Sequence, residues 1–376
     1  MKILQWAFPY LPTRGGREIF IERLSSDLHS KGNDIFMFAN ESREDAPLIE
    51  SVGNQFPIER INLELVSKLE KPELFEEAIV HAVSCLDKWK PEIVHLHNIA
   101  GLSPMLLSES LKRLNFRPKI VLTHHSLADK DSFIKVGRWK LLAQIIDVVV
   151  LPSQYNFDMF KAFGGFPTSK AKLIHNGVPL PNPSDASIKV DSEEYFVYGG
   201  RLAFEKGVGV LLSAWKMLQT KNPNIKLKIA GAGALDAMLR DFAREIQVDD
   251  SVEFLGWVDQ AEMRALISGS IGVVVPSTYS EPFGLIAAEA QALGIPVIAS
   301  NIGGLSEIVD PGKTGLLTQP GDFSQLYGAM RYFIENTEVR IRFGEEGAKR
   351  AAKLFALDDS HRKYESLFRD LINEHH

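Results

Sequence analysis

Two carboxylates, Glu281 and Glu289, stand eight positions apart in a segment that could bind a sugar and a phosphate. The apolar run 271–275 precedes them, which predicts a buried strand, a polar loop and a helix starting near Phe283, with Glu289 about two turns in. Carboxylates accept hydrogen bonds from vicinal hydroxyls, and free amides at a helix start attract anions. An ordinary strand–loop–helix unit is the structural alternative. The amides expected to face a ligand belong to Phe283, Gly284 and Leu285.

A second set of candidate residues follows the apolar run 195–198. Gly200 lets the backbone approach a ligand closely. Arg201 can bind phosphate oxygens as a fork, and Lys206 can act as a point charge. The alternative is a solvated loop with two surface cations.

Three further segments could contact a ligand. Gly231 and Gly233 form a glycine-rich turn after an apolar run, which suits ligand contact or a tight strand–helix turn equally. Leu255 ends another run, where a base could bind. Gly15 and Gly16 precede a helical pattern and predict a cradle for phosphate or sugar, with a purely geometric turn as the alternative.

The histidines are clustered in two places. Alternation along a strand would put His95 and His97 on one face, and His124 and His125 close another strand. Zinc needs three or four suitable ligands, and no cysteine pair supports such a site. We therefore expect one histidine at a strand tip to face the substrate, and no metal site.

The elements that must position these residues alternate along the whole chain. Apolar runs separated by helical periodicity predict parallel sheets covered by helices on both faces. The expected strands are 3–7, 34–39, 93–97, 120–124, 148–151, 195–198, 226–230, 252–254, 271–275 and 297–299, and the expected helices include 18–30, 73–89 and 208–218. In such sheets, ligands bind beyond the carboxyl ends of the strands.

The pattern is interrupted once by a proline-rich polar stretch, which predicts two domains. We expect a Rossmann-like domain over 1–180, a linker over 181–192, a second Rossmann-like domain over 193–357 and a C-terminal helix over 358–376. The last helix is expected to cross back to the first domain. The fold class is α/β, with two doubly wound parallel sheets facing each other across a cleft.

Composition excludes several classes of protein. The chain has 376 residues, 45% of them hydrophobic, and a formal net charge of −6, which argues against a nucleic-acid binder. The single cysteine, Cys85, excludes a disulfide framework and fits a reducing compartment. No apolar run approaches the roughly 18 residues that span a bilayer. We expect a cytoplasmic protein.

Two charged segments have alternative interpretations. The triplet 129–131 reads Asp-Lys-Asp, a metal-binding pattern of enzymes with a different fold, but it is expected here to be a solvated surface loop. The stretch 130–140 is basic and amphipathic, which suits either an exposed helix or peripheral contact with the inner face of a membrane.

The ordered set of motifs resembles the retaining nucleotide-sugar glycosyltransferases of family 4, which have the GT-B fold. The resemblance covers nearly the whole chain and is strongest over 196–320. It rests on Gly15 and Gly16, Thr123 to His125, Asn176 to Val178, Gly200 to Leu202, Lys206, Gly207, Gly231 to Gly233, Leu255, Gly256, Pro276, Ser277, Glu281 to Leu285, Glu289, Ala290, 294–297, Gly303, Gly304 and Glu307.

The resemblance implies a role for each matching residue. Arg201 and Lys206 hold the donor diphosphate, Glu281 faces the donor sugar, and Glu289 binds the ribose hydroxyls. His125 corresponds to the family's histidine near the reacting sugar, and Gly16 lies against donor phosphate or sugar. The implied partners are a UDP- or GDP-linked sugar and a carbohydrate or lipid-linked acceptor, with no cofactor. The implied pathway is cell-surface polysaccharide or glycolipid assembly.

The chain departs from the family pattern at two positions, and several alternative functions remain. The family usually has Pro and Asp around its Asn-Gly-Val motif, where this chain has His175 and Pro179. Either His124 or His125 could face the substrate. A nucleotide-sugar epimerase, a phosphorylase or a non-catalytic binding subunit could use the same fold. An epimerase would release free isomerised sugar, and a non-catalytic subunit predicts loss of the cations or of Glu281.

Overall fold

The structure is a computed structural model that describes residues 1–8, 15–40, 49–53, 56–69, 71–97, 101–126, 142–163, 166–181 and 194–374. The chain forms two compact units. Unit 1 comprises Met1–Ile174 and His361–His376, and unit 2 comprises His175–Ser360. The predicted linker, apart from Pro181, lies outside the described residues, as do the Asp-Lys-Asp triplet and the basic stretch.

Unit 1 is built on a sheet whose strand order is β3-β4-β2-β1-β5-β6-β7-β8. The strands are parallel except for β3, which pairs antiparallel with β4. The strands are β1 (Lys2–Ala7), β2 (Asp34–Asn40), β3 (Ile49–Gly53), β4 (Pro57–Ile61), β5 (Ile93–His97), β6 (Lys119–Thr123), β7 (Val148–Leu151) and β8 (Ala171–Leu173).

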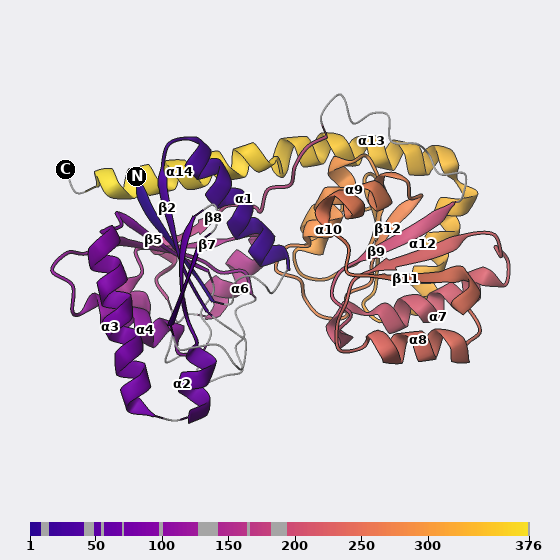
Figure 1. The fold of residues 1–376 in the computed structure, drawn as a ribbon. Helices are drawn as coiled ribbons and strands as arrows, with labels where there is room; N and C mark the ends of the chain where they lie inside the picture. Colours follow the sequence, from indigo (N-terminus) through magenta and orange to yellow (C-terminus); the bar gives the residue numbers. More distant parts are fainter. Residues whose placement is uncertain are drawn as a thin grey trace. The chain divides into compact units, whose positions relative to one another are not determined.

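Helices cover both faces of this sheet, as Figure 1 shows. Successive β1 residues Ile3 and Leu4 belong to the two different cores, because alternate side chains of a strand point to opposite faces. The helices are α1 (Gly16–Ser30), α2 (Leu63–Leu69), α3 (Pro72–Trp89), α4 (Ser103–Leu111), α6 (Gln154–Phe163) and, from His361 onward, α14 (Leu357–Asn373), with the 3-10 turn η1 (Thr168–Lys170). The α1 and α14 helices pack on one face, and α3 and α4 on the other.

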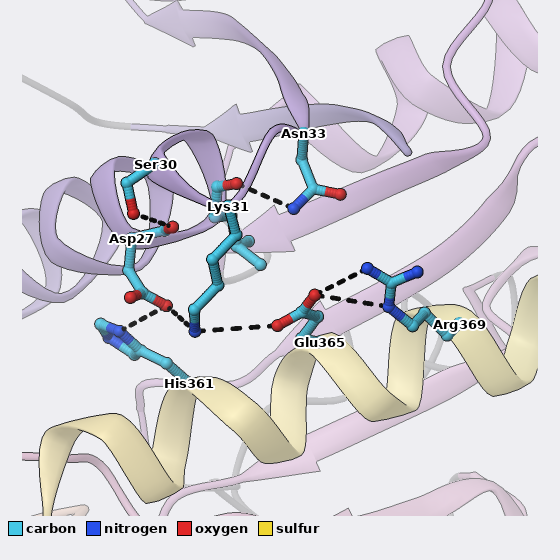
Figure 2. A network of polar contacts seen from close by, with 8 residues as sticks. Asp27, Ser30, Lys31, Asn33, His361, Glu365 and Arg369 are labelled. Carbon is cyan, nitrogen blue, oxygen red and sulfur yellow. Dashed lines mark hydrogen bonds and ion pairs between the residues drawn. The ribbon is translucent and has the colours of Figure 1, made fainter.

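The final helix is fixed to unit 1 by an apolar face and by charges. Tyr364 and Phe368 are fully buried in the core shared with α1. Figure 2 shows the polar contacts beside it, in which Lys31 Nζ lies 2.7 Å from Asp27 Oδ2 and 3.7 Å from Glu365 Oε2. The C-terminal segment is therefore part of unit 1.

Unit 2 has a fully parallel sheet of strand order β11-β10-β9-β12-β13-β14. Its strands are β9 (Tyr195–Gly199), β10 (Lys226–Ala230), β11 (Val252–Gly256), β12 (Gly272–Val275), β13 (Val297–Ser300) and β14 (Gly315–Thr318). Its helices are α7 (Val208–Gln219), α8 (Asp236–Glu245), α9 (Gln260–Ser268), α10 (Leu285–Ala292), α11 (Leu305–Ile308), α12 (Phe323–Glu335) and α13 (Thr337–Leu354), with 3-10 turns η3 (Phe204–Lys206) and η4 (Asp249–Ser251).

The two faces of this sheet are again both buried. Residues of α7, α8 and α12 form one core, and residues of α9, α10 and α11 form the other. All strand carboxyl ends meet at one edge because the sheet is parallel. Two doubly wound parallel sheets confirm the predicted α/β architecture. Among the described helices, none combines the length and apolarity needed to cross a bilayer.

Candidate functional site

The carboxyl edge of the unit 2 sheet brings together the residues predicted to bind the donor, except Gly15 and Gly16, which lie in unit 1. Arg201 and Lys206 follow β9, and Gly231 and Gly233 follow β10. Leu255 lies near the end of β11, and the 281–285 segment follows β12. Sequence reasoning placed these residues at strand ends, and the parallel sheet brings the strand ends together.

Lys206 and Glu281 form a direct ion pair at this edge. The Nζ of Lys206 lies 2.5 Å from Oε1 of Glu281, and the hydroxyl of Ser277 donates to the same oxygen at 2.7 Å. The two charged side chains are only 22% and 14% exposed, so water screens the pair less than it would at an open surface. A partly shielded ammonium beside a carboxylate is a site where a polar ligand could replace one partner.

Arg201 lies outside this pair. Its guanidinium is 66% exposed and contacts Glu205 at 2.9 Å. Its backbone is fixed instead, because the buried hydroxyl of Tyr198 donates to the Arg201 carbonyl at 2.8 Å. Burial raises the pKa of Tyr198, and the charge of Glu281 adds to this, so the hydroxyl keeps its proton. The loop is therefore held while the cationic side chain stays accessible.

The glycines after β10 allow two loops to approach each other. A Cβ on Gly231 would lie 1.8 Å from the Gly200 carbonyl oxygen, and one on Gly233 would lie 2.3 Å from the Leu202 carbonyl oxygen. Leu202 N donates to Ala232 O at 2.9 Å across the same approach. Close packing of backbone against backbone thus accounts for both glycines, whichever ligand binds nearby.

The loop that carries Glu281 is held by the turn after β13. Gly304 N donates to Glu281 O at 2.8 Å. Gly303 has φ of +60°, and a Cβ there would lie 2.5 Å from the same oxygen. Two glycines without side chains therefore let the neighbouring turn fix the backbone of Glu281.

The helix after this loop starts later than predicted. It begins at Leu285, because Gly284 has φ of +112° and cannot belong to a right-handed helix. Glu289 is consequently in the second turn, at the fifth residue, and not two turns in. The Phe283 ring is buried, 5.4 Å from the Phe355 ring centroid, so only its backbone could face a ligand. The first helix amides lack intrahelical acceptors.

Gly15 and Gly16 start α1 of unit 1, where an unexpected carboxylate lies. Gly15 is the N-cap, and a Cβ there would lie 2.9 Å from Oε2 of Glu18. Glu18 is buried and paired with Arg17. The Glu18 carboxylate can accept hydrogen bonds from hydroxyl groups, and the Arg17 guanidinium beside it balances its charge, so this helix start suits either a sugar or a phosphate.

The histidines of unit 1 form two hydrogen-bonded chains. His95 Nε2 lies 2.7 Å from Thr123 Oγ1, and His97 Nδ1 lies 3.2 Å from His125 Nε2. Burial lowers the pKa of His95 to about 3 and those of His97 and His125 well below the ordinary value; Arg17 adds to the effect on His125. These rings are neutral at physiological pH.

His124 and His125 differ in exposure. His124 is 5% exposed and its backbone N–H continues the pairing with β7 through the Val150 carbonyl. His125 is partly exposed at the end of β6, with Phe20 edge-on at 5.0 Å. Exposure therefore favours His125 as the substrate-facing histidine.

One other group of potential metal ligands occurs in the described residues, and sequence reasoning did not single it out. Glu59, His81 and Cys85 have ligand atoms within 4.8 Å of one another. Burial raises the pKa of the Cys85 thiol to about 12, and His81 Nε2 lies 3.5 Å from its sulfur. The thiol is therefore protonated at neutral pH, and its contact with His81 is a polar one.

Sequence reasoning assigned no role of their own to Ser277, Tyr198, Gln5 and Phe204. Ser277, which it included only in the family resemblance, donates to the Glu281 carboxylate, and Tyr198 donates to the Arg201 carbonyl. Both stand close in sequence to a predicted residue. Gln5 lies in the apolar strand β1, and its amide oxygen is 2.8 Å from His97 Nε2. Nothing in the local sequence indicates this role, because the partner of a polar residue inside an apolar strand is known only from the fold. Phe204 is 79% exposed in the loop between Arg201 and Lys206, which a loop assignment could have suggested.

Two protein-family models and a glycogen synthase are similar to this chain. Residues 14–181 match the family Glycosyltransferase Family 4, and residues 183–350 match Glycosyl transferases group 1. Glycogen synthase of Mycobacterium tuberculosis is 30% identical over 278 residues, which cover 71% of this chain and 66% of that enzyme.

Solved structures have the same fold. Sucrose-phosphate synthase of Thermosynechococcus elongatus superposes with a TM-score of 0.81 at 23% identity, covering 100% of both chains. HepE of Anabaena in complex with UDP-glucose superposes with a TM-score of 0.78 at 19% identity, covering 98% of this chain and 100% of that one. The chain belongs to the group 1, family 4 glycosyltransferases and has their GT-B fold.

Proposed function

We propose that the protein transfers a sugar from a nucleotide diphosphate sugar to an acceptor with retention of anomeric configuration. The observation that carries the proposal is the contact of Lys206 with Glu281 at the carboxyl edge of unit 2. One residue can bind phosphate and the other can bind sugar hydroxyls, so their 2.5 Å separation suits a ligand in which phosphate and sugar are directly joined.

The chemical difficulty is the departure of the nucleotide diphosphate. The bond from the anomeric carbon to the phosphate oxygen breaks while the acceptor oxygen forms its bond to the same face of that carbon. The acceptor proton passes to the leaving phosphate oxygen, so atoms and charge balance. Lys206, Arg201 and the first amides of α10 would stabilise the growing negative charge, and the proposed step needs no metal.

The donor proposal has support from relatives. HepE binds UDP-glucose in a structure of the same fold. In this chain we propose a UDP- or GDP-linked sugar, with Glu289 on the ribose and the Leu255–Gly256 segment near the base. Leu255 is 39% exposed and a Cβ on Gly256 would meet nothing within 4 Å, which leaves the end of β11 available to a ligand.

Unit 1 is proposed to bind the acceptor. His125 and the Gly15–Gly16 helix start would contact the sugar that reacts, and the Glu18 carboxylate can accept hydrogen bonds from its hydroxyl groups. The acceptor is proposed to be a carbohydrate or a lipid-linked sugar of cell-surface polysaccharide or glycolipid assembly, in a cytoplasmic enzyme. Peripheral contact with the membrane is a further proposal, which absence of flotation with anionic liposomes would refute.

Thermal unfolding with UDP, GDP, ADP and dTDP, each with and without Mg²⁺, tests the donor site. A ligand at 100 times its dissociation constant stabilises the native state by about 2.7 kcal/mol, which shifts the melting temperature by a few degrees. We expect one nucleotide to give a shift that does not depend on Mg²⁺. A shift seen only with Mg²⁺ would contradict metal independence, and no shift with any nucleotide would contradict the donor proposal.

Product analysis tests the reaction itself. With the donor identified, the anomeric proton coupling of the product should show the same configuration as the donor sugar. An inverted product would refute retention, and release of free isomerised sugar without acceptor would favour an epimerase.

A further inference from the structure

Three side chains with different donor atoms meet between β4 and α3 of unit 1. Glu59 comes from β4, and His81 and Cys85 come from α3. A carboxylate oxygen, an imidazole nitrogen and a sulfur atom of these residues all lie within 4.8 Å of one another. The group shares no residue with the sites proposed above for the donor and the acceptor, so glycosyl transfer does not explain it.

The positions of these residues in the sequence bring them together. His81 and Cys85 are four positions apart in α3, which places them on one face of the helix, about one turn apart. Glu59 lies two positions before Ile61 in β4, so both side chains point to the same face of the sheet. Ile61 and Cys85 belong to one hydrophobic core. A carboxylate therefore occupies a strand position that faces the helix carrying the imidazole and the thiol.

The distances within the group suit a tetrahedral metal ion. His81 Nε2 lies 3.5 Å from Cys85 Sγ and 3.5 Å from Glu59 Oε2. Zinc bonds of about 2.0–2.1 Å to nitrogen, 2.0–2.2 Å to oxygen and 2.3 Å to sulfur, at tetrahedral angles, separate the ligand atoms by about 3.3–3.6 Å. Two of the three separations thus already match a zinc site. Rotation about the side-chain bonds of Glu59 can bring its oxygen closer to the sulfur.

The charges of the group also favour a cation. Burial raises the pKa of the Cys85 thiol most, and the negative charge of Glu59 raises it further. A thiolate and a carboxylate repel each other here, and a divalent cation between them would neutralise both charges. The contact between His81 and Glu59 is longer than the roughly 2.7–3.2 Å of an ordinary hydrogen bond, so it is not a strong direct bond that the ion would have to replace.

We propose that Glu59, His81 and Cys85 bind a zinc ion, with water as a fourth ligand, and that the ion ties α3 to β4. Mixed sulfur, nitrogen and oxygen ligands suit zinc, whereas magnesium and calcium take oxygen alone. Zinc binds the thiolate, so the thiol proton is released to solvent on binding. A carboxylate has two oxygens, which lets Glu59 bind the ion through one and keep another contact through the other. The His81 and Glu59 side chains are 21% and 14% exposed, which gives water and the ion access.

Cobalt(II) is the probe for this site, because it occupies tetrahedral zinc sites and its thiolate complexes give a near-ultraviolet charge-transfer band. Cys85 is the only cysteine of the chain, so the band identifies this residue without any substitution. The full-length protein, freed of metal by a chelator and kept reduced with a phosphine, is titrated with Co²⁺. We expect the band to appear and to disappear when Zn²⁺ is added. Its absence at saturating Co²⁺ would overturn the proposal.

Substitutions test whether the three residues act together. Glu59→Gln and His81→Gln should each weaken Co²⁺ binding by tenfold or more, because even an outer-shell partner of a metal ligand is worth about 10–100-fold in affinity. The matched control is Glu76→Gln, which changes an exposed carboxylate of the same helix that is paired with Arg113. We expect it to keep the wild-type affinity, with circular dichroism confirming that all variants fold. Equal affinity in all these proteins would mean adventitious binding by the thiol alone and would overturn the three-residue site.

Thermal unfolding tests the structural role of the ion. Zn²⁺ at 100 times its dissociation constant should raise the melting temperature of the wild type by a few degrees, and excess chelator should reverse the shift. Cys85→Ser should show no such shift. No shift in the wild type, or an equal shift in Cys85→Ser, would contradict the proposal that the ion ties α3 to β4. These measurements need no sugar donor, so their outcome does not depend on the proposed transferase reaction.

Discussion

Lys206 Nζ lies 2.5 Å from Glu281 Oε1, although 75 positions separate the two residues in the chain. The ammonium that we propose for phosphate binding is thus already neutralised by the carboxylate that we propose for sugar binding. A diphosphate that contacts Lys206 must share it with Glu281, and Glu281 would repel the diphosphate if the ammonium were absent. The two residues should therefore act as a unit in substitution experiments.

Lys206→Ala should lower turnover by about 10²-fold or more, on the scale of losing one preorganised charge in an active site. The matched control is Lys313→Ala, which removes a 72% exposed lysine paired with Asp310 in the same unit. Steady-state kinetics of both variants, with circular dichroism to confirm folding, provide the measurement. Wild-type turnover in Lys206→Ala would exclude the residue from the reaction.

Glu281→Gln should separate nucleotide binding from chemistry. Glutamine can still accept from Ser277 and Lys206, but it removes the negative charge that opposes a diphosphate. We expect the nucleoside diphosphate to bind at least as tightly as to the wild type, while turnover falls by tenfold or more. Calorimetric titration and steady-state kinetics would measure both effects. Weaker nucleotide binding with unchanged turnover would reverse the assigned role.

Arg201→Ala should reduce turnover by about 10²-fold and leave stability nearly unchanged. Its exposed ion pair with Glu205 contributes only about 0–1 kcal/mol to folding. Arg244→Ala is the control, because Arg244 is also about two-thirds exposed and paired on the surface of unit 2. Urea unfolding measures the stability of both variants, and steady-state kinetics measures their turnover. A large loss of stability in Arg201→Ala would indicate a structural role.

Sequence patterns predicted the parallel strands of the sheet centres, because these strands are continuous apolar runs buried on both faces. They missed β3, β4, β8 and β14. Three of these lie at sheet edges, where strands are short and need less apolar character. The antiparallel pairing of β3 was also unpredicted, since a local pattern does not specify strand direction.

The same limit applies to the candidate site. Strand ends and residue types placed Arg201, Lys206 and Glu281 at one edge, but which cation contacts the carboxylate depends on side-chain packing. The helix was expected to start near Phe283, but the φ of +112° at Gly284 makes that residue the N-cap and Leu285 the first helical residue. Glycine is likewise required at position 231 because the backbone of Gly200, distant in sequence, lies where a Cβ would be.

Gly231→Ala should destabilise unit 2 by about 1–3 kcal/mol or more, the usual cost of overpacking, because its Cβ would lie 1.8 Å from the Gly200 carbonyl. Gly328→Ala is the control, since Gly328 lies in the interior of α12 and a Cβ there meets nothing within 4 Å. Alanine in a helix interior should stabilise by roughly 0.5–1 kcal/mol. Urea unfolding of both variants gives the comparison. Equal stability of the two variants would contradict the close-approach explanation.

The buried neutral histidines should make unit 1 sensitive to acid. His95 has a pKa of about 3 in the folded state and about 6.5 in the unfolded chain, so the unfolded state binds more protons between these values. Stability contributed by this residue is therefore complete above pH 6.5 and decreases as the pH falls toward 3. Between pH 7 and pH 5, His95 alone should account for a loss of about 2 kcal/mol.

The variant His95→Gln tests this dependence, because glutamine does not titrate and can still reach the Thr123 hydroxyl. We expect His95→Gln to be less stable than the wild type at pH 7 but to lose about 2 kcal/mol less between pH 7 and pH 5. Urea unfolding at both pH values measures the four free energies of unfolding. Identical pH dependence in the two proteins would mean that the folded state accepts a proton at His95, which would contradict its burial in an apolar core beside Tyr364 and Phe368.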